Sequence, residues 1–279
     1  MWHWAHLIMG NKIVIAIGAH PDDIEFVMAG TLLMLKKAGW ETHYLSLASG
    51  NCGSSDYNAA ATRAIRNTEA RTAAKILGAH FHPNLTDDLE ILYNLGLLRE
   101  LAAILREVKP AIVLTHSPQD YMEDHSNTSR LAVTAAFARG MPNFKTSPSR
   151  PAIKEEVTVY HAMPTGLRDQ LRRRVIPGAF VNTTSVHSRK HEALAAHKSQ
   201  QRWLDVSQGM NCYLLAMEDM SLEMGRMSRR FKHAEGWRRH LHCGFCAAEA
   251  DPLAQALKKN YLVNTAYERS LERPEGLGA

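Results

Sequence analysis

The residues of this chain that could do chemistry lie in two short polar clusters. His20 and Asp23 belong to the sequence AHPDD, which ends an apolar segment, and His125 closes a second cluster, HSPQDYMEDH at 116–125. A catalytic zinc site needs histidine and carboxylate ligands and one open coordination position for water. His20 and Asp23 are three residues apart in a turn, close enough to share one ion, whereas His125 must be brought near by the fold. We therefore predict His20, Asp23 and His125 as metal ligands.

Asp22 is predicted to have a different role from that of its neighbour Asp23. Adjacent residues in a turn generally point in different directions, so Asp22 is expected to face the water molecule that the metal activates. A metal lowers the pKa of such a water toward about 7, and a carboxylate beside it can take the proton as a general base. Pro21 would help to hold the turn by fixing its φ angle. The alternative is that the two aspartates only cap a helix, but the second polar cluster favours a site.

Alternating strand and helix signals indicate how the two clusters are positioned. Strands are predicted at 12–19, 41–49, 109–116, 157–163 and 179–186, and helices at 24–39, 58–77, 97–108, 127–139, 188–204 and over much of 208–240. This order predicts an α/β fold, with a Rossmann-like, mostly parallel sheet, flanking helices and a C-terminal strand and helix extension. Ligands of such sheets bind beyond the carboxyl ends of the strands, and both polar clusters follow such ends.

The chain is expected to form one domain with short additions at its ends. We divide its 279 residues into an N-terminal lead-in at 1–11, an α/β domain at 12–250 and a C-terminal tail at 251–279. The hydrophobic fraction of 45% is enough for a full-sized core. The loops 50–58 and 141–153 are expected to form walls or lids of the site, because long loops in compact domains are often functional.

Charge and hydropathy argue against several classes of protein. The formal net charge is +5, but the 33 basic residues are interleaved with 28 acidic ones, so no nucleic-acid partner is expected. No apolar run approaches the roughly 20 residues of a membrane span, and the first ten residues do not read as a signal peptide. We therefore expect a cytoplasmic protein. Cys243 and Cys246, in the sequence CGFC, are interpreted as reduced, packed thiols rather than as a metal or redox site.

Four segments of the chain together resemble one known family. They are AHPDD with Gly30 seven residues beyond it, RNTEARTAAKILG, DYMEDH and KHEALAAHKSQ. Over about residues 12–240 the chain resembles the PIG-L/LmbE-like family of zinc-dependent N-acetylglucosaminyl deacetylases. The resemblance implies a Rossmann-like sheet, a Zn²⁺ site that Fe²⁺ could also occupy, and hydrolytic removal of acetyl from an N-acetylglucosamine-type amino sugar or its conjugate. It also implies a small-molecule amino-sugar partner and a homo-oligomer, either a trimer or a hexamer.

The resemblance assigns roles to single positions. The three predicted ligands match the zinc ligands of the family, and Asp22 matches its general base. Arg66 matches an arginine that contacts substrate, although it could instead form an ordinary surface pair with Glu69. Asp124, which we group with the substrate-binding residues, matches the carboxylate beside the last ligand, which supports a nearby histidine in the family.

The chain departs from the family pattern at Met122. Many relatives read H-x-D-H here, and the first histidine stabilises or protonates the transition state, whereas a thioether cannot donate a proton. The candidates to replace it are His197, Tyr121 and His116, in that order, with Asp120 to orient one of them. We assign His197 a catalytic role and Tyr121 a substrate-binding role. The alternative for His197 is an exposed histidine on a helix.

Several other interpretations compete with a deacetylase. A pseudoenzyme that keeps zinc and a sugar pocket would explain Met122, but it would not need Asp22. A metallohydrolase for a different amide is also compatible, whereas a magnesium or manganese phosphoesterase would usually be richer in carboxylates. A dinucleotide-binding protein is disfavoured, because the first turn lacks G-x-G-x-x-G. Trp203, Trp237 and Tyr213 could stack on a sugar or simply pack.

Overall fold

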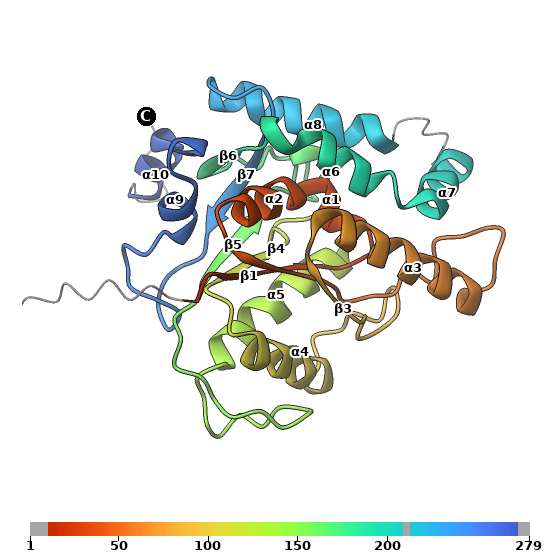
Figure 1. Ribbon diagram of the computed structural model, residues 1–279, viewed down its shortest axis with the longest axis horizontal. Coiled ribbons are helices and arrows are strands. Elements are labelled where there is room, and N and C mark those ends of the chain that lie inside the picture. The colour runs from red at the N-terminus through yellow and green to blue at the C-terminus, as the bar shows by residue number, and fades with distance from the viewer. Residues whose placement is uncertain (1–10, 209–212, 273–279) are drawn as a thin grey trace, which may run out of the picture.

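The computed structural model describes residues 11–208 and 213–272, which form a central β-sheet with helices on both faces (Figure 1). The strands are β1 (Ile13–Gly18), β2 (Glu41–Ser46), β3 (His80–His82), β4 (Ile112–Thr115), β5 (Thr158–Ala162), β6 (Ala179–Asn182), β7 (Ala234–Arg239) and β8 (Tyr261–Val263). Their order in the sheet is β3-β2-β1-β4-β5-β7-β6-β8. Neighbours from β3 to β5 are parallel, and the pairs that involve β7 or β8 are antiparallel. The predicted Rossmann-like, mostly parallel fold with a C-terminal extension is confirmed.

Helices cover both faces of the sheet. They are α1 (Asp23–Val27), α2 (Ala29–Lys37), α3 (Ala59–Leu77), α4 (Leu95–Val108), α5 (Glu123–Ala138), α6 (His187–Leu194), α7 (Lys198–Gln208), α8 (Tyr213–Ser228), α9 (Pro252–Leu257) and α10 (Thr265–Leu271). In Figure 1, α4 and α5 lie on one face, and α2, α3, α6 and α8 lie on the other. Within the described part of the chain, no helix combines the length and apolar composition needed to cross a membrane.

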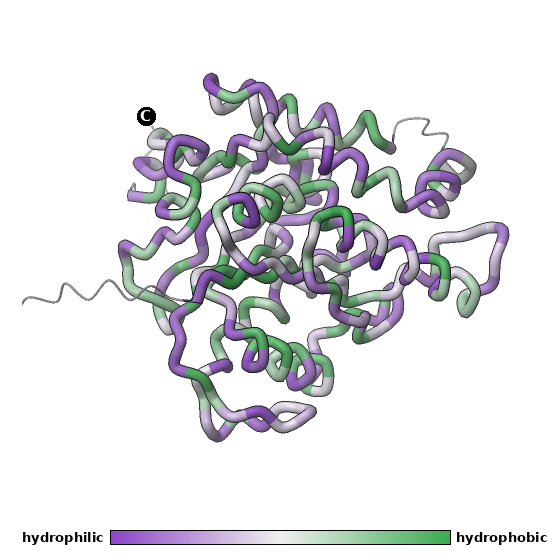
Figure 2. Tube along the Cα trace, viewed as in Figure 1, coloured by the Kyte–Doolittle hydropathy of each residue, from purple (hydrophilic) through white to green (hydrophobic). Residues whose placement is uncertain are grey.

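The core is divided into two main layers by the central strand. Val14 and Ala16 of β1 join the apolar cluster under α2 and α3, whereas Ile15 and Ile17 join the cluster under α4 and α5. This alternation follows from the two-residue period of a strand. Figure 2 shows hydrophobic colouring along parts of the central strands and mixed colouring on the outer helices. The apolar run that follows Lys12 is therefore a strand buried on both faces, as predicted.

The helix predicted at 24–39 is divided into α1 and α2. The backbone leaves the helical conformation at Met28, where φ is −131° and ψ is −25°. Gly30 allows a close approach to the sheet, since a Cβ atom there would lie 2.4 Å from the side chain of Thr183. The carboxylate of Glu235 accepts hydrogen bonds from the N–H of Gly30 at 2.8 Å and from that of the next residue at 2.7 Å. A carboxylate from β7 therefore caps α2.

Glu235 also forms a buried ion pair. One carboxylate oxygen lies 2.8 Å from Nζ of Lys190 on α6, and their side chains are 3% and 1% exposed. Buried charges are costly unless they are paired and hydrogen-bonded, so this pair links α2, α6 and β7.

Trp237, two residues after Glu235 in β7, is fully buried, and its indole N–H donates a hydrogen bond to Thr31 at 2.9 Å. Trp237 therefore packs in the core and does not stack on a sugar.

The C-terminal part of the chain differs most from the prediction. The helical segment 188–204 consists of α6 and α7, which are separated at 195–197. Helix was predicted over much of 208–240, but residues 234–239 form β7 between β5 and β6. The described part of the tail predicted at 251–279 contains α9, β8 and α10, and β8 pairs with β6. These residues extend the central sheet.

The loop 141–153 lies at the wrong end of α5 to be a lid. His125 is in the first turn of α5, whereas the loop follows the last turn, about 20 Å away at 1.5 Å per residue. The buried guanidinium of Arg106 anchors this region through backbone carbonyls. The acceptors are those of Ala138, Arg139, Met141 and Arg150. The predicted lid role of this loop is therefore wrong.

Candidate metal centre

The turn that follows β1 has an unusual backbone at Asp22. Its φ of 109° and ψ of −27° lie in a region that is costly for residues other than glycine. The N–H of Asp23 bonds to the carbonyl of His20 at 3.3 Å, which closes the turn. As a result, Asp23 faces histidines while Asp22 faces a different set of partners. The two adjacent carboxylates are separated, as the sequence predicts.

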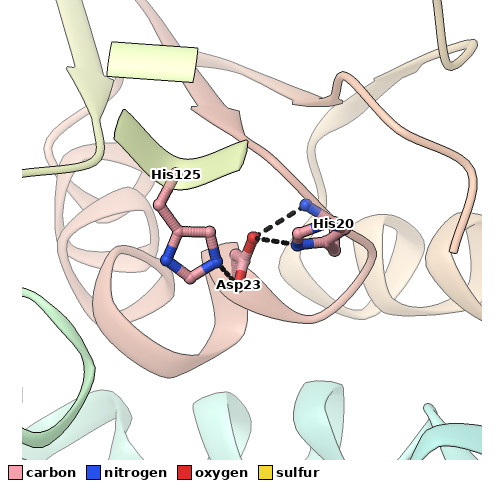
Figure 3. Close-up of side chains that lie close together, drawn as sticks. All are labelled: His20, Asp23 and His125. Atoms are coloured by element: carbon pink, nitrogen blue, oxygen red, sulfur yellow. Dashed lines mark hydrogen bonds and ion pairs between the residues drawn. The ribbon is translucent and has the colours of Figure 1, made fainter. Parts of the chain in front are cut away.

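His20, Asp23 and His125 converge beyond the sheet (Figure 3). Oδ2 of Asp23 lies 3.4 Å from Nδ1 of His20, and Oδ1 lies 3.3 Å from Nε2 of His125. One donor atom from each residue lies within 4.8 Å of the other two. His20 and Asp23 follow β1, and His125 comes from α5 after the neighbouring strand β4. The structure thus brings together the three residues predicted as ligands.

Two further carboxylates hold the histidine rings. Oδ2 of Asp124 lies 2.9 Å from Nε2 of His20, and Oδ1 of Asp120 lies 3.0 Å from Nδ1 of His125. Histidine ligands of metals usually donate their second N–H to such a group. Nε2 of His125, which faces Asp23, is buried and has no hydrogen-bond partner among the described residues. This donor set fits a divalent cation. Asp124 contacts a predicted ligand, and its predicted contact with substrate stays a prediction.

The charges of the site favour a bound cation. Burial opposes protonation of His20 and His125, but nearby carboxylates outweigh it and raise their pKa values to about 9 and about 10. Burial would raise the pKa of Asp23, yet His125 and His116 hold it well below its usual value. A metal must displace the protons from the two rings, so its affinity is expected to fall as the pH falls.

Asp22 lies beside these residues but has its own partners. Its carboxylate is buried, accepts a 2.7 Å hydrogen bond from the hydroxyl of Tyr213, and lies 3.8 Å from the guanidinium of Arg66. Burial raises the pKa of Asp22, and Arg66 opposes that shift. A carboxylate with a raised pKa is better suited to accept a proton. Sequence reasoning missed this role of Tyr213, because nothing near position 213 indicates a contact with position 22.

Arg66 is a buried part of the site. Its guanidinium donates to the carbonyl of Pro21 and to the side chain of Gln200. Glu69 instead accepts hydrogen bonds from the N–H and hydroxyl of Ser199, at 2.8 and 2.6 Å. The alternative of a surface pair between Arg66 and Glu69 is therefore wrong. Arg66 holds the turn that carries Asp22, and its predicted contact with substrate stays a prediction.

His197 is fully buried in the turn between α6 and α7. Its Nε2 lies 3.4 Å from Oε1 of Glu25, whose other oxygen accepts a 3.2 Å hydrogen bond from Tyr44. The alternative of an exposed histidine is therefore wrong. His197 is not among the residues grouped as possible metal ligands, but charge on it would lower the pKa of Asp22. Its predicted catalytic role stays a prediction.

The other two candidates for the missing histidine differ in exposure. Tyr121 is 55% exposed, and its ring centroid lies 5.9 Å from that of His125. Partial burial and nearby carboxylates raise its pKa to about 12, so the hydroxyl keeps its proton near neutral pH. His116 is buried, stacks on His125 at 4.1 Å, and accepts a 2.9 Å hydrogen bond from the N–H of Ala19. Of the three candidates, Tyr121 is the one that solvent reaches most.

The CGFC pair lies apart from this centre. Cys243 and Cys246 are free thiols, and neither belongs to a group of possible metal ligands among the described residues. Cys246 is partly buried, with its sulfur 3.5 Å from the hydroxyl of Thr158. Cys243 is exposed, so the expectation of a packed thiol is wrong for this residue.

Comparison with known proteins relates this chain to enzymes. Residues 15–136 match the family model PIG-L, GlcNAc-PI de-N-acetylase. The diacetylchitobiose deacetylase of Thermococcus kodakarensis is 29% identical over 237 residues, which cover 81% of this chain and 82% of that protein. The 4-oxalmesaconate hydratase of Pseudomonas putida is 27% identical over 199 residues, which cover 68% of this chain and 75% of that protein. The structure of N,N′-diacetylchitobiose deacetylase from Pyrococcus horikoshii has a TM-score of 0.68 at 23% identity, covering 87% of this chain and 88% of that one.

Proposed function

Because the chain belongs to the PIG-L family, we propose that it is a metal-dependent deacetylase of an N-acetylglucosamine-type amino sugar or its conjugate. The observation that carries this proposal is the group formed by His20, Asp23 and His125, with Asp22 held separately beside it. Two imidazoles and one carboxylate suit Zn²⁺ with a coordination position left for water. The same ligand set suits Fe²⁺, so we propose zinc with ferrous iron as the alternative.

The reaction follows from the roles of the chain's own residues. The metal, when bound, polarises the acetamide carbonyl and makes water more acidic. Asp22 takes a proton from the attacking water, whose oxygen bonds to the carbonyl carbon. When the C–N bond breaks, that proton goes to the nitrogen, and the products are acetate and the free amine. Tyr213 and Arg66 hold Asp22 in place, and we assign Tyr121 to donate to the developing oxyanion where Met122 cannot.

A cavity near the site has a mixed polar and apolar lining, which suits a sugar, since a sugar presents both hydroxyl groups and C–H surfaces. It measures about 740 Å³ and lies between α3 and the loop 83–90. Its lining includes Ser49, Arg63, Asn67, Asn84, Asp87 and Glu90. The same loop reaches the metal centre, because the N–H of Leu89 donates to Asp124 at 2.9 Å. We assign this cavity to the part of the substrate that extends beyond the acetylated sugar.

The similarity to a hydratase supports one competing function. The 4-oxalmesaconate hydratase of Pseudomonas putida matches 68% of this chain. A hydratase adds water across a carbon–carbon double bond, and the same base and metal ligands could activate that water. The two functions differ in their products, because a hydratase releases neither acetate nor an amine.

One assay tests both functions. Protein stripped by a chelator and protein reloaded with Zn²⁺ or Fe²⁺ would be given a panel of N-acetylglucosamine conjugates, with acetate and amine both measured. A parallel arm would follow the ultraviolet absorbance of 4-oxalmesaconate, which falls when the double bond is hydrated. Metal-dependent release of acetate and amine in equal amounts is expected. Loss of absorbance without acetate release would favour the hydratase, and silence in both arms from metal-loaded protein would favour a pseudoenzyme.

The predicted assembly and location are proposals of the same kind. We propose a homo-oligomer, a trimer or hexamer, in the cytoplasm, whose partner is the small-molecule substrate. Light scattering of the purified protein tests the oligomeric state directly. A monomer over the working concentration range would remove the assembly from the proposal.

A further inference from the structure

A second group of possible metal ligands lies outside the predicted catalytic site. His187 begins α6, Glu218 lies in α8, and His233 directly precedes β7. Nε2 of His233 is 2.8 Å from one carboxylate oxygen of Glu218, and Nε2 of His187 contacts the other. One donor atom from each residue lies within 4.8 Å of the other two. Three segments that are distant in sequence therefore bring two imidazoles and a carboxylate within reach of one ion.

The side chains of this group are packed against one another and are largely shielded from solvent. The two imidazole rings stack with centroids 3.9 Å apart and planes 6° apart. The side chains of His187 and His233 are 11% and 7% exposed, whereas Glu218 is 31% exposed and leaves one side open to solvent.

We propose that His187, Glu218 and His233 form a second divalent-metal site, suited to Zn²⁺ or a similar transition ion. Two histidines and one glutamate are a ligand set that zinc uses in proteins. This site does not depend on the proposed hydrolysis, because none of its residues belongs to the centre formed by His20, Asp23 and His125.

The second site is expected to bind metal more weakly than the first. In the first site, Asp124 and Asp120 accept hydrogen bonds from the outer nitrogens of both histidine ligands. In the second site, Nδ1 of His187 and Nδ1 of His233 are buried and have no partner among the described residues. Loss of such a supporting contact typically weakens metal binding by about 10–100-fold. Added metal should therefore occupy the first site before the second.

Metal at the second site would fix the position of α8. Glu218 is the ligand from α8, and the two histidines come from α6 and from the residue before β7. The first residue of the same helix, Tyr213, donates a hydrogen bond to Asp22 at 2.7 Å. A cation bound to all three ligands thus ties α8 to the sheet and steadies the residue that holds the predicted base.

Metal titration of matched variants tests the proposal. Metal-free full-length protein would be titrated with Zn²⁺ against a chromophoric chelator, and bound metal would be counted by mass spectrometry after gel filtration. Wild type is expected to bind two equivalents, the second about 10–100-fold more weakly. Glu218→Gln should bind one equivalent with unchanged affinity. Glu223→Gln is the control, because Glu223 lies on the same helix and its ion pairs among the described residues are those with Arg174 and Arg226 at the surface.

Further variants separate loss of the site from loss of the fold. His125→Ala should keep the weaker equivalent and lose the tighter one. The weaker equivalent should raise the thermal midpoint of wild type and of Glu223→Gln, but not that of Glu218→Gln. If Glu218→Gln does not fold, His187→Asn takes its place in the same comparison. A single equivalent in wild type, or a second equivalent that persists in both Glu218→Gln and His187→Asn, would overturn the proposal.

Discussion

The hydroxyl of Tyr213 donates a 2.7 Å hydrogen bond to Oδ2 of Asp22. Both side chains are buried, and Asp22 has the unfavourable backbone conformation described above. A hydrogen bond to a carboxylate favours its ionised form, so Tyr213 opposes the rise in pKa that burial causes at Asp22. α8 thereby sets both the orientation and the basicity of the predicted general base.

Replacement of Tyr213 by Phe is expected to lower kcat/KM by about 10–100-fold, because a hydrogen bond to a charged group contributes roughly 1.5–3 kcal/mol. The acidic limb of the pH–rate profile should also move to higher pH. Tyr160→Phe is a matched control, since its buried hydroxyl donates to Asp251 at 2.7 Å away from the site. Steady-state kinetics from pH 5 to 9 measures both effects. Equal losses of activity in the two variants would mean that Tyr213 acts only through stability.

The adjacent carboxylates Asp22 and Asp23 should separate catalysis from metal binding. Asp22→Ala is expected to keep bound zinc while turnover falls by about 10²–10⁴-fold, the usual contribution of a general base. Asp23→Ala is expected to lose tightly bound zinc, because Asp23 lies between the two histidines. Zinc analysis and turnover of both variants give the comparison. Full turnover in the first variant would refute the base assignment, and unchanged zinc in the second would refute the ligand assignment.

Asp120 is expected to control metal affinity without touching the metal. It accepts a hydrogen bond from Nδ1 of His125 at 3.0 Å, so Asp120→Asn should weaken zinc binding by about 10–100-fold. Glu41→Gln is a suitable control, because Glu41 contacts Nε2 of His43 at 3.0 Å at the start of β2, at the opposite end of the strands from the site. Competition with a chelator measures both dissociation constants. A loss of the same size in the control would point to a general electrostatic effect.

Sequence patterns predicted four of the five strands in the parallel half of the sheet and missed the short strand β3. β1 and β4 have continuous apolar runs, and the polar clusters that follow them meet as expected. β7 was missed because its sequence, AEGWRR, has little strand character and is stabilised by pairing with β5 and β6. The partners of Asp22 were missed for a related reason. Tyr213 is 191 residues away from Asp22 in the sequence, and no local sequence pattern relates residues that far apart.

The buried ion pair between Lys190 and Glu235 is expected to support stability rather than catalysis. Lys190→Met leaves a buried carboxylate without its cation, which typically costs about 3–5 kcal/mol. Lys109→Met, which breaks a half-exposed pair with Glu155 at 3.7 Å, should cost less than about 1 kcal/mol. Urea unfolding of both variants measures the free energies. Similar small losses would show that the backbone N–H groups of α2 suffice to stabilise the carboxylate.

His161 should make the protein less stable in mild acid. Its ring is buried, with Nδ1 2.8 Å from the carbonyl of His116 and Nε2 3.0 Å from Nδ1 of His240. Burial lowers its pKa from 6.5 to about 4. Between these values the unfolded chain binds a proton that the folded chain does not, so the free energy of unfolding falls as the pH falls through this window. This loss of stability is small above pH 6.5 and amounts to about 2 kcal/mol at pH 5.

His161→Gln should reduce the slope of unfolding free energy against pH by about one proton between pH 6 and 5, whereas replacement of the exposed His191 by Gln should not. Because the other histidines are common to all three proteins, identical slopes in urea unfolding would show that His161 is already protonated in the folded state.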